Sequence, residues 1–177
     1  MRWILTIAVC MAWTYVTAQY RPDQKSSTVK FTTKYFGVET GGTVAGLNGF
    51  IVWSDGCPLV DCKFDVSVDA STIQTGVELR DNHLRGEDFL DAANHPHIRF
   101  VSSKVEPMDG KQTFTVYGEL TIKNHTKKIS FPFTAEPIDN GYLFKGSFQI
   151  SRKDFEVGNS TIISDNVSVI MSVLATK

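Results

Sequence analysis

The chain has 177 residues, a formal net charge of −1 and 42% hydrophobic residues. This length suits one domain with a substantial core. Its lysines and arginines are scattered rather than gathered in a stripe, which argues against nucleic acid as a partner.

The N-terminus has the pattern of a secretory signal peptide. Arg2 supplies a positive charge, residues 3–16 are uncharged and largely apolar, and Val16-Thr17-Ala18 resembles the small-residue pattern before a cleavage site. We therefore predict a signal peptide over residues 1–18, a single mature domain over 19–177, and a periplasmic or secreted protein. The apolar run is short for a membrane span, and no later segment is long and apolar enough to cross a bilayer.

Short segments of alternating apolar and polar residues make up most of the mature chain. Turn signals such as Asp55-Gly56, Asp109-Gly110 and Asn140-Gly141 separate them, a spacing typical of an all-β sandwich or barrel. An alternation of period two predicts strands that are buried on one face. The clearest of these apolar faces belong to residues 64–68, 114–122, 129–133, 142–150 and 167–173.

Two cysteines of the mature chain lie close together, in the sequence Cys57-Pro58-Leu59-Val60-Asp61-Cys62. The four residues between them are enough for a turn, and a close pair tends to bridge in an exported protein. We predict a structural disulfide between Cys57 and Cys62. A metal or redox pair is less favoured, because the spacing is not Cys-x-x-Cys and no second pair completes a zinc site.

One segment, residues 78–91, breaks the alternation. Leu79, Leu84, Phe89 and Leu90 are spaced without strict period two, with charged residues between them. This pattern predicts one short helix at about residues 80–91 that covers part of the barrel. The alternating segments amount to about eight strands. If eight strands close into a barrel, its interior has room for side chains or for one small ligand.

Phenylalanine is the commonest aromatic residue, with twelve copies, and several occupy apolar strand faces. These rings either fill a packed core or line a tunnel for an elongated apolar molecule. The polarity of the strand faces gives the candidate wall residues Val66, Val68, Phe100, Phe114, Val116, Phe131, Phe144, Phe148 and Met171.

Motifs along the chain, from about Val29 to Val173, match those of a known family. The densest are Ile73 with Thr75-Gly76, Arg80-Asp81 with His83-Leu84, Phe89 with Asp91, Pro96, Ile98 and Phe100, Gly118 with Leu120-Thr121-Ile122, and Arg152-Lys153-Asp154-Phe155. In these the sequence resembles the YceI-like family. It departs from the family at Tyr35, where many members carry a histidine, and at Glu156, which replaces a common glycine.

The resemblance implies an eight-stranded, lipocalin-like antiparallel barrel. It also implies non-catalytic binding, transport or storage of a long-chain amphiphile, such as a polyisoprenoid, an isoprenoid quinone or a fatty-acid-like lipid. No cofactor is expected other than that lipid. An edge strand or the barrel mouth could also pair with a second copy to give a homodimer.

Four polar residues are candidates for the mouth of the barrel: Tyr35, Arg80, Asp81 and His83. A guanidinium presents paired donors that suit a carboxylate or phosphate head group. In the alternative interpretation, Arg80 and Asp81 pair structurally and His83 anchors the helix by a hydrogen bond, because buried charges need partners. The sequence leaves both open.

Metal binding and catalysis have little support in the sequence. Asp91, His95 and His97 are close in sequence, but zinc sites usually need three or four ligands and no further ligand has a readable spacing. No Gly-x-Ser-x-Gly elbow or phosphate-binding glycine loop is present. Two alternatives to lipid binding remain: a stress-response or interaction module with a packed barrel, and an unrecognised hydrolase or isomerase that acts on a lipid.

Overall fold

The computed structural model describes residues 18–53, 59–109 and 112–177. Within these ranges one sheet of ten strands dominates the fold. The strands are β1 (Ala18–Pro22), β2 (Thr28–Tyr35), β3 (Val38–Val44), β4 (Asn48–Trp53), β5 (Lys63–Asp69), β6 (His97–Pro107), β7 (Thr113–Ile122), β8 (His125–Ile138), β9 (Gly141–Ser151) and β10 (Asn166–Thr176). The helical elements are η1 (Leu59–Asp61), η2 (Ala70–Thr72), α1 (Glu78–Arg85) and η3 (Arg152–Phe155).

The ten strands occupy eight positions around a closed antiparallel barrel. β1 and β2 follow one another along the same edge of β10, and β4 and β3 pair with them in turn. β1 and β2 therefore share one position in the wall, and β3 and β4 share the next. Each pair is equivalent to a single wall strand that is interrupted by a break. The eight-stranded antiparallel barrel that the family resemblance implies is confirmed, and the breaks account for the two additional strands.

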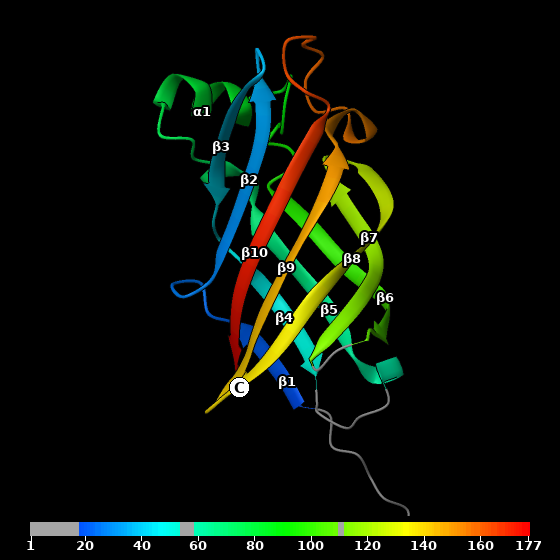
Figure 1. Ribbon diagram of the computed structural model, residues 1–177. Coiled ribbons are helices and arrows are strands. Elements are labelled where there is room, and N and C mark those ends of the chain that lie inside the picture. The colour runs from blue at the N-terminus through cyan, green and yellow to red at the C-terminus, as the bar shows by residue number, and fades with distance from the viewer. Residues whose placement is uncertain (1–17, 54–58, 110–111) are drawn as a thin grey trace, which may run out of the picture.

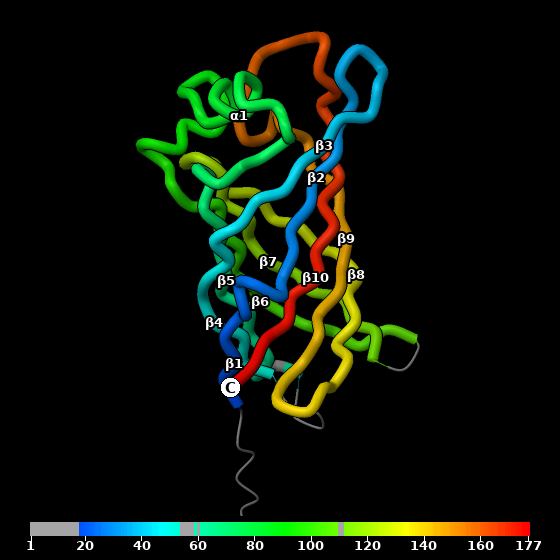
Figure 2. The backbone as a smooth tube through the Cα atoms, turned by 90° about the vertical axis from the view of Figure 1, so that its left-hand side faces the viewer, coloured from blue at the N-terminus to red at the C-terminus, as the bar shows by residue number. Residues whose placement is uncertain are grey.

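The two ends of the barrel differ in what surrounds them. Figures 1 and 2 place α1, the β2–β3 turn and the chain between η3 and β10 together at one end, which we call the upper end. The C-terminus, β1 and the β8–β9 turn lie at the lower end. Chain segments far apart in sequence therefore meet around the upper opening.

The lower end is filled by aromatic side chains around Trp53, which is 1% exposed. Its ring centroid lies 4.8 Å from that of Phe114, 5.6 Å from Phe144 and 5.7 Å from Phe133. Most of these contacts are edge-to-face, the arrangement that aromatic pairs prefer. Cys62 is buried in the same cluster. Because Cys57 lies outside the described residues, the disulfide stays a prediction, as does the signal peptide over residues 1–18.

The predicted helix is present, but it covers Glu78–Arg85 instead of residues 80–91. Gly86 ends it: its backbone is extended, with φ −69° and ψ 168°, and its N–H donates to the His83 carbonyl. Phe89 and Leu90 are buried in the turns that follow. Sequence spacing alone could not separate buried turn residues from a continuing helix. No helix in the described ranges has the length and hydropathy of a membrane span.

Gly118 shows why a glycine lies on an apolar face of β7. A Cβ atom placed there would lie 2.6 Å from Cζ of Phe100 and 2.5 Å from the carbonyl oxygen of Val101. Only glycine lets the Phe100 ring lie this close to the backbone of the neighbouring strand. The ring can therefore lie along the inner wall of the barrel.

Candidate functional site

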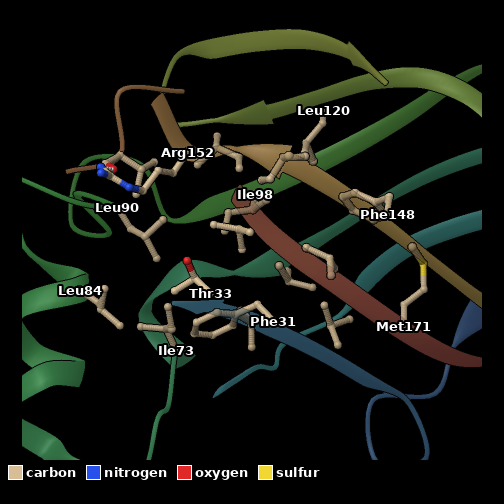
Figure 3. Close-up of a pocket in the computed structure, with 18 of the residues that line it drawn as sticks. Phe31, Thr33, Ile73, Leu84, Leu90, Ile98, Leu120, Phe148, Arg152 and Met171 are labelled. Atoms are coloured by element: carbon tan, nitrogen blue, oxygen red, sulfur yellow. Dashed lines mark hydrogen bonds between the residues drawn. The ribbon is translucent and has the colours of Figure 1, made fainter. Parts of the chain in front are cut away.

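The upper barrel encloses an apolar cavity of about 1090 Å³. Ligand pockets for small molecules span roughly 300–1,000 Å³, so this cavity is large. Figure 3 shows Phe31, Leu84, Phe148 and Met171 directed into one space from different elements. Helix α1 and the turns after it contribute to the lining alongside the strands.

The cavity is long as well as large. On β10 the alternate residues Val167, Val169, Met171 and Val173 all line it, a span of about 20 Å at roughly 3.3 Å per residue. Ile170, between two of them, faces outward and is 54% exposed. At the lower end Phe64, Phe133 and Phe144 belong both to the lining and to the cluster around Trp53. The aromatic cluster is thus the floor of the cavity.

The structure brings together most of the wall residues proposed from the sequence. Those that line the cavity are Val66, Val68, Phe100, Val116, Phe131, Phe144, Phe148 and Met171. Phe114 is the exception, because its ring packs 4.8 Å from the Trp53 ring, within the aromatic cluster that forms the floor. The alternation of β7 correctly gave its inward face, but it could not show that Trp53 fills the barrel at that level.

Several lining residues were not proposed from the sequence. Leu120 and Ile122 continue the apolar alternation of Val116, so the pattern that gave Val116 could have given them as well. Phe31 continues the alternation of Val29 on β2, so that pattern could have given it too, whereas Ile73 and Leu90 come from loop segments where no periodicity marks the inward face. Only the tertiary structure assigns Ile73 and Leu90 to the cavity.

The polar residues proposed for the mouth have different positions. Tyr35, Arg80 and His83 line the upper cavity, whereas Asp81 does not. The His83 ring lies 4.8 Å from the Phe89 ring, so a ring contact with Phe89 takes the place of the anchoring hydrogen bond that the structural interpretation assigned to it.

Asp81 is 5% exposed and anchors α1 to the segment before it. Its carboxylate accepts hydrogen bonds from the backbone N–H of Thr75, at 2.8 Å, and from the Thr75 hydroxyl. These bonds stabilise the charged form and hold the pKa of Asp81 below its usual range. Because its carboxylate is turned toward Thr75, Asp81 is a structural residue at the mouth.

Arg80 also meets Thr75, so the expected direct pair between Arg80 and Asp81 is replaced by a shared partner. Its Nε donates to the Thr75 hydroxyl at 2.7 Å, and its Nη2 donates to the Thr75 carbonyl at 3.0 Å. Arg85 adds a bond from Nη2 to the Ile73 carbonyl, at 2.8 Å. The polar side chains of α1 therefore fix the helix over the upper barrel.

Arg152 is a further lining residue, and it organises the mouth from the opposite side. Its side chain is 4% exposed and donates to five backbone carbonyls, those of Val157, Gly158, Ser160, Ile163 and Ser164. It also pairs with Asp165 at 3.1 Å. One buried guanidinium, seen at the edge of the cavity in Figure 3, thus shapes residues 157–165, several of which line the cavity. The motif Arg152-Lys153-Asp154-Phe155 contributes to the family resemblance but does not reveal this role.

The described residues contain no group of three or more His, Cys, Asp or Glu side chains placed to hold a metal ion. Asp91 and His95 form a pair, with 3.6 Å between Oδ2 and Nε2. His97 lies at the start of β6, opposite Asp69. The three residues weighed as metal ligands are therefore not gathered at one site.

Comparison with known proteins agrees with this architecture. The sequence profile of the YceI-like domain matches residues 20–175. The chain belongs to the YceI-like family. A UPF0312 protein of Pseudomonas fluorescens is 33% identical over 84% of this chain and 81% of its own length.

Two solved structures share the fold. Burkholderia cenocepacia BcnA aligns with a TM-score of 0.81 at 24% identity, over 88% of this chain and 99% of that one. A polyisoprenoid binding domain from Saccharophagus degradans aligns with a TM-score of 0.72 at 13% identity, over 89% of this chain and 97% of that one. At these identities the likeness concerns the fold of the barrel.

Proposed function

We propose that this protein binds the hydrocarbon part of a long-chain amphiphile, such as a polyisoprenoid, an isoprenoid quinone or a fatty-acid-like lipid, inside the upper barrel, without chemical change. The observation that carries the proposal is the elongated cavity of about 1090 Å³ with its apolar wall. Membership of the YceI-like family and the polyisoprenoid binding domain with the same fold support it.

The physical basis is the transfer of an apolar chain out of water. Each buried methylene contributes roughly 0.8 kcal/mol, so an extended chain gains affinity with few polar contacts. Side chains such as Phe131 and Phe148, whose rings stack at 4.7 Å, give a rigid apolar wall with little side-chain freedom to lose. Tyr35, Arg80 and His83 lie at the opening, where a polar head group would remain near water.

The arrangement of the lining supports binding rather than catalysis. A hydrolase or isomerase would need a nucleophile and a base within hydrogen-bond reach inside the cavity. The lining histidine, His83, packs against Phe89, and no hydrogen bond in the described ranges joins it to a lining serine or threonine. A packed interaction module, the other alternative, is disfavoured by the hollow interior.

Two tryptophan substitutions on β10 test the proposal. Met171 faces the cavity and Ile170, its neighbour, faces outward. Two measurements are made. Wild-type protein is purified gently and extracted with organic solvent, and any co-purified lipid is identified by mass spectrometry. Binding of a dansyl-labelled fatty acid, and its displacement, is measured for the wild type and both variants. We expect Met171→Trp to lower affinity for the probe by about tenfold or more, because the indole occupies space for several methylenes. Ile170→Trp should leave affinity unchanged. An empty wild-type extract together with no probe binding would contradict the proposal.

A periplasmic or secreted location is part of the same proposal and rests on the sequence of residues 1–18. Cell fractionation, followed by N-terminal sequencing of the mature protein, tests it. Recovery of the full chain from the cytoplasm would contradict both the location and the cleavage.

A further inference from the structure

Large apolar side chains are exposed around the opening of the cavity. Of the ten exposed residues of this kind in the described ranges, six come from the β2–β3 turn, the start of α1 and the chain before β10. We call these six residues the mouth rim: Tyr35, Phe36, Val38, Val77, Leu79 and Ile162. Figures 1 and 2 show the three segments together at the upper end. Exposed apolar residues are ordinary when scattered, but a group of them marks an interaction site.

Phe36 is the rim residue that the fold explains least. It lies in the two-residue turn between Tyr35 and Val38, with φ 49°, followed by Gly37 with φ 77°. A hairpin turn with two left-handed residues favours Asn-Gly, and a bulky residue at the first position is strained. The side chain is also 68% exposed, with its ring against Tyr35 at 4.9 Å. Neither the turn nor the core therefore requires a phenylalanine there.

The mouth rim continues the wall of the cavity. Tyr35, Val77, Leu79 and Ile162 are exposed at the surface and also line the cavity. Apolar surface thus extends from the interior to the outside. The tip Tyr35–Val38 and residues 157–163 contain no charged residue.

The charges behind the rim have both signs, which favours an uncharged partner. Lys34 and Glu39 flank the β2–β3 turn, and Glu78 and Arg80 flank Leu79. A folded protein docked here would have to bridge the hollow at the centre of the ring. Mobile acyl chains can instead conform to the ring and enter the opening.

We propose that the mouth rim docks on the lipid surface of a membrane, so that a ligand chain passes between bilayer and cavity without crossing water. The inference rests on the proposed function of the cavity and adds the partner from which the ligand comes. A chain that left the cavity through water would lose the stabilisation of every buried methylene at once. Contact between the rim and the bilayer removes that barrier.

Phe36 and Val38 allow docking to be tested apart from binding, because neither lines the cavity. Flotation with phosphatidylcholine vesicles measures docking, with phosphatidylglycerol added in a second series to detect a charge effect. Transfer of a dansyl-labelled fatty acid from the protein to vesicles measures the rate of release. We expect Phe36→Asn to lower both vesicle binding and transfer rate by about tenfold, since it removes one large apolar contact. Val38→Ser should act in the same direction with a smaller effect.

The same variants separate docking from a structural role. Phe36→Asn should keep or raise the Tm, because Asn-Gly suits the turn, and should keep the affinity for the probe in solution. Ile138→Asn is the matched control: Ile138 is 40% exposed at the lower end, in the strand that enters the β8–β9 turn, and its loss should change neither assay.

Each outcome decides the proposal. Lower vesicle binding and slower transfer by Phe36→Asn, with the control unchanged, support it. Probe binding without vesicle binding by the wild type overturns docking and leaves the proposed function intact. No probe binding at all contradicts the proposed function itself. A wild-type dimer that Phe36→Asn converts to a monomer would assign the rim to a second copy of the chain and overturn docking.

Discussion

The lower and upper halves of this barrel share most of their strands but not the same interior. At the lower end the Trp53 ring meets those of Phe114, Phe133 and Phe144 in a packed aromatic cluster. At the upper end Phe31, Phe100 and Phe148 face a cavity of about 1090 Å³. The same alternation of apolar residues therefore supports a packed core in one half and a ligand site in the other. In the lower half, side chains from different walls meet one another around Trp53. In the upper half they face the cavity instead.

The largest expected effect comes from the packed half. Trp53→Ala should lower the free energy of unfolding by about 3–5 kcal/mol, because a fully buried ring leaves a cavity that its neighbours cannot fill. Phe148→Ala, in the hollow half, should cost only about 1–2 kcal/mol, because its ring is partly buried and already borders empty space. Urea denaturation of the two variants measures the difference. Equal losses would mean that the two halves are packed alike.

A smaller effect is expected from the buried cation at the mouth. Arg152→Lys should cost about 1.5–3 kcal/mol, because a single ammonium cannot reach the five carbonyls that the guanidinium satisfies. Hydrogen exchange should become faster in residues 157–165 while the lower end stays protected. Lys153→Ala is the control. Lys153 contacts the same Asp165, but its side chain is 60% exposed, so the cost should stay within about 0.5 kcal/mol. Uniform loss of protection along the barrel would show that the mouth is not an independent unit.

The smallest effect is the pH dependence of the α1 anchor. Hydrogen bonds from Thr75 lower the pKa of Asp81 in the folded state, so its contribution to stability is fully present above the unfolded value, about 3.9, and is lost as pH falls through the folded pKa. Asp81→Asn removes this titration. The stability difference between wild type and variant, measured by thermal unfolding, should therefore be constant near neutral pH and shrink below about pH 4. A difference that grows on acidification would contradict the assigned role of Thr75.

Much of the fold follows from local chemistry. The alternation of residues such as Val66 and Val68 fixes which side of a strand is apolar, and the motif around Arg80 and His83 places the chain in its family. The start of the helix was predicted to within two residues, since the loss of alternation is visible in the sequence. Its end at Gly86 was missed because Phe89 and Leu90, although buried in turns, carry the apolar spacing of a helix.

By itself the sequence determined an all-β fold whose strands each carry one apolar face, because strand periodicity is a local property of the chain, and the family resemblance implied the closed barrel. Only the tertiary structure decided where that interior is full and where it is hollow, because that depends on distances between residues far apart in sequence. Trp53 closes one end since it meets rings from several other strands, and the Phe114 ring is among them. The loop segments that carry Ile73 and Leu90 show no period, so their place in the cavity lining emerges only when the barrel closes.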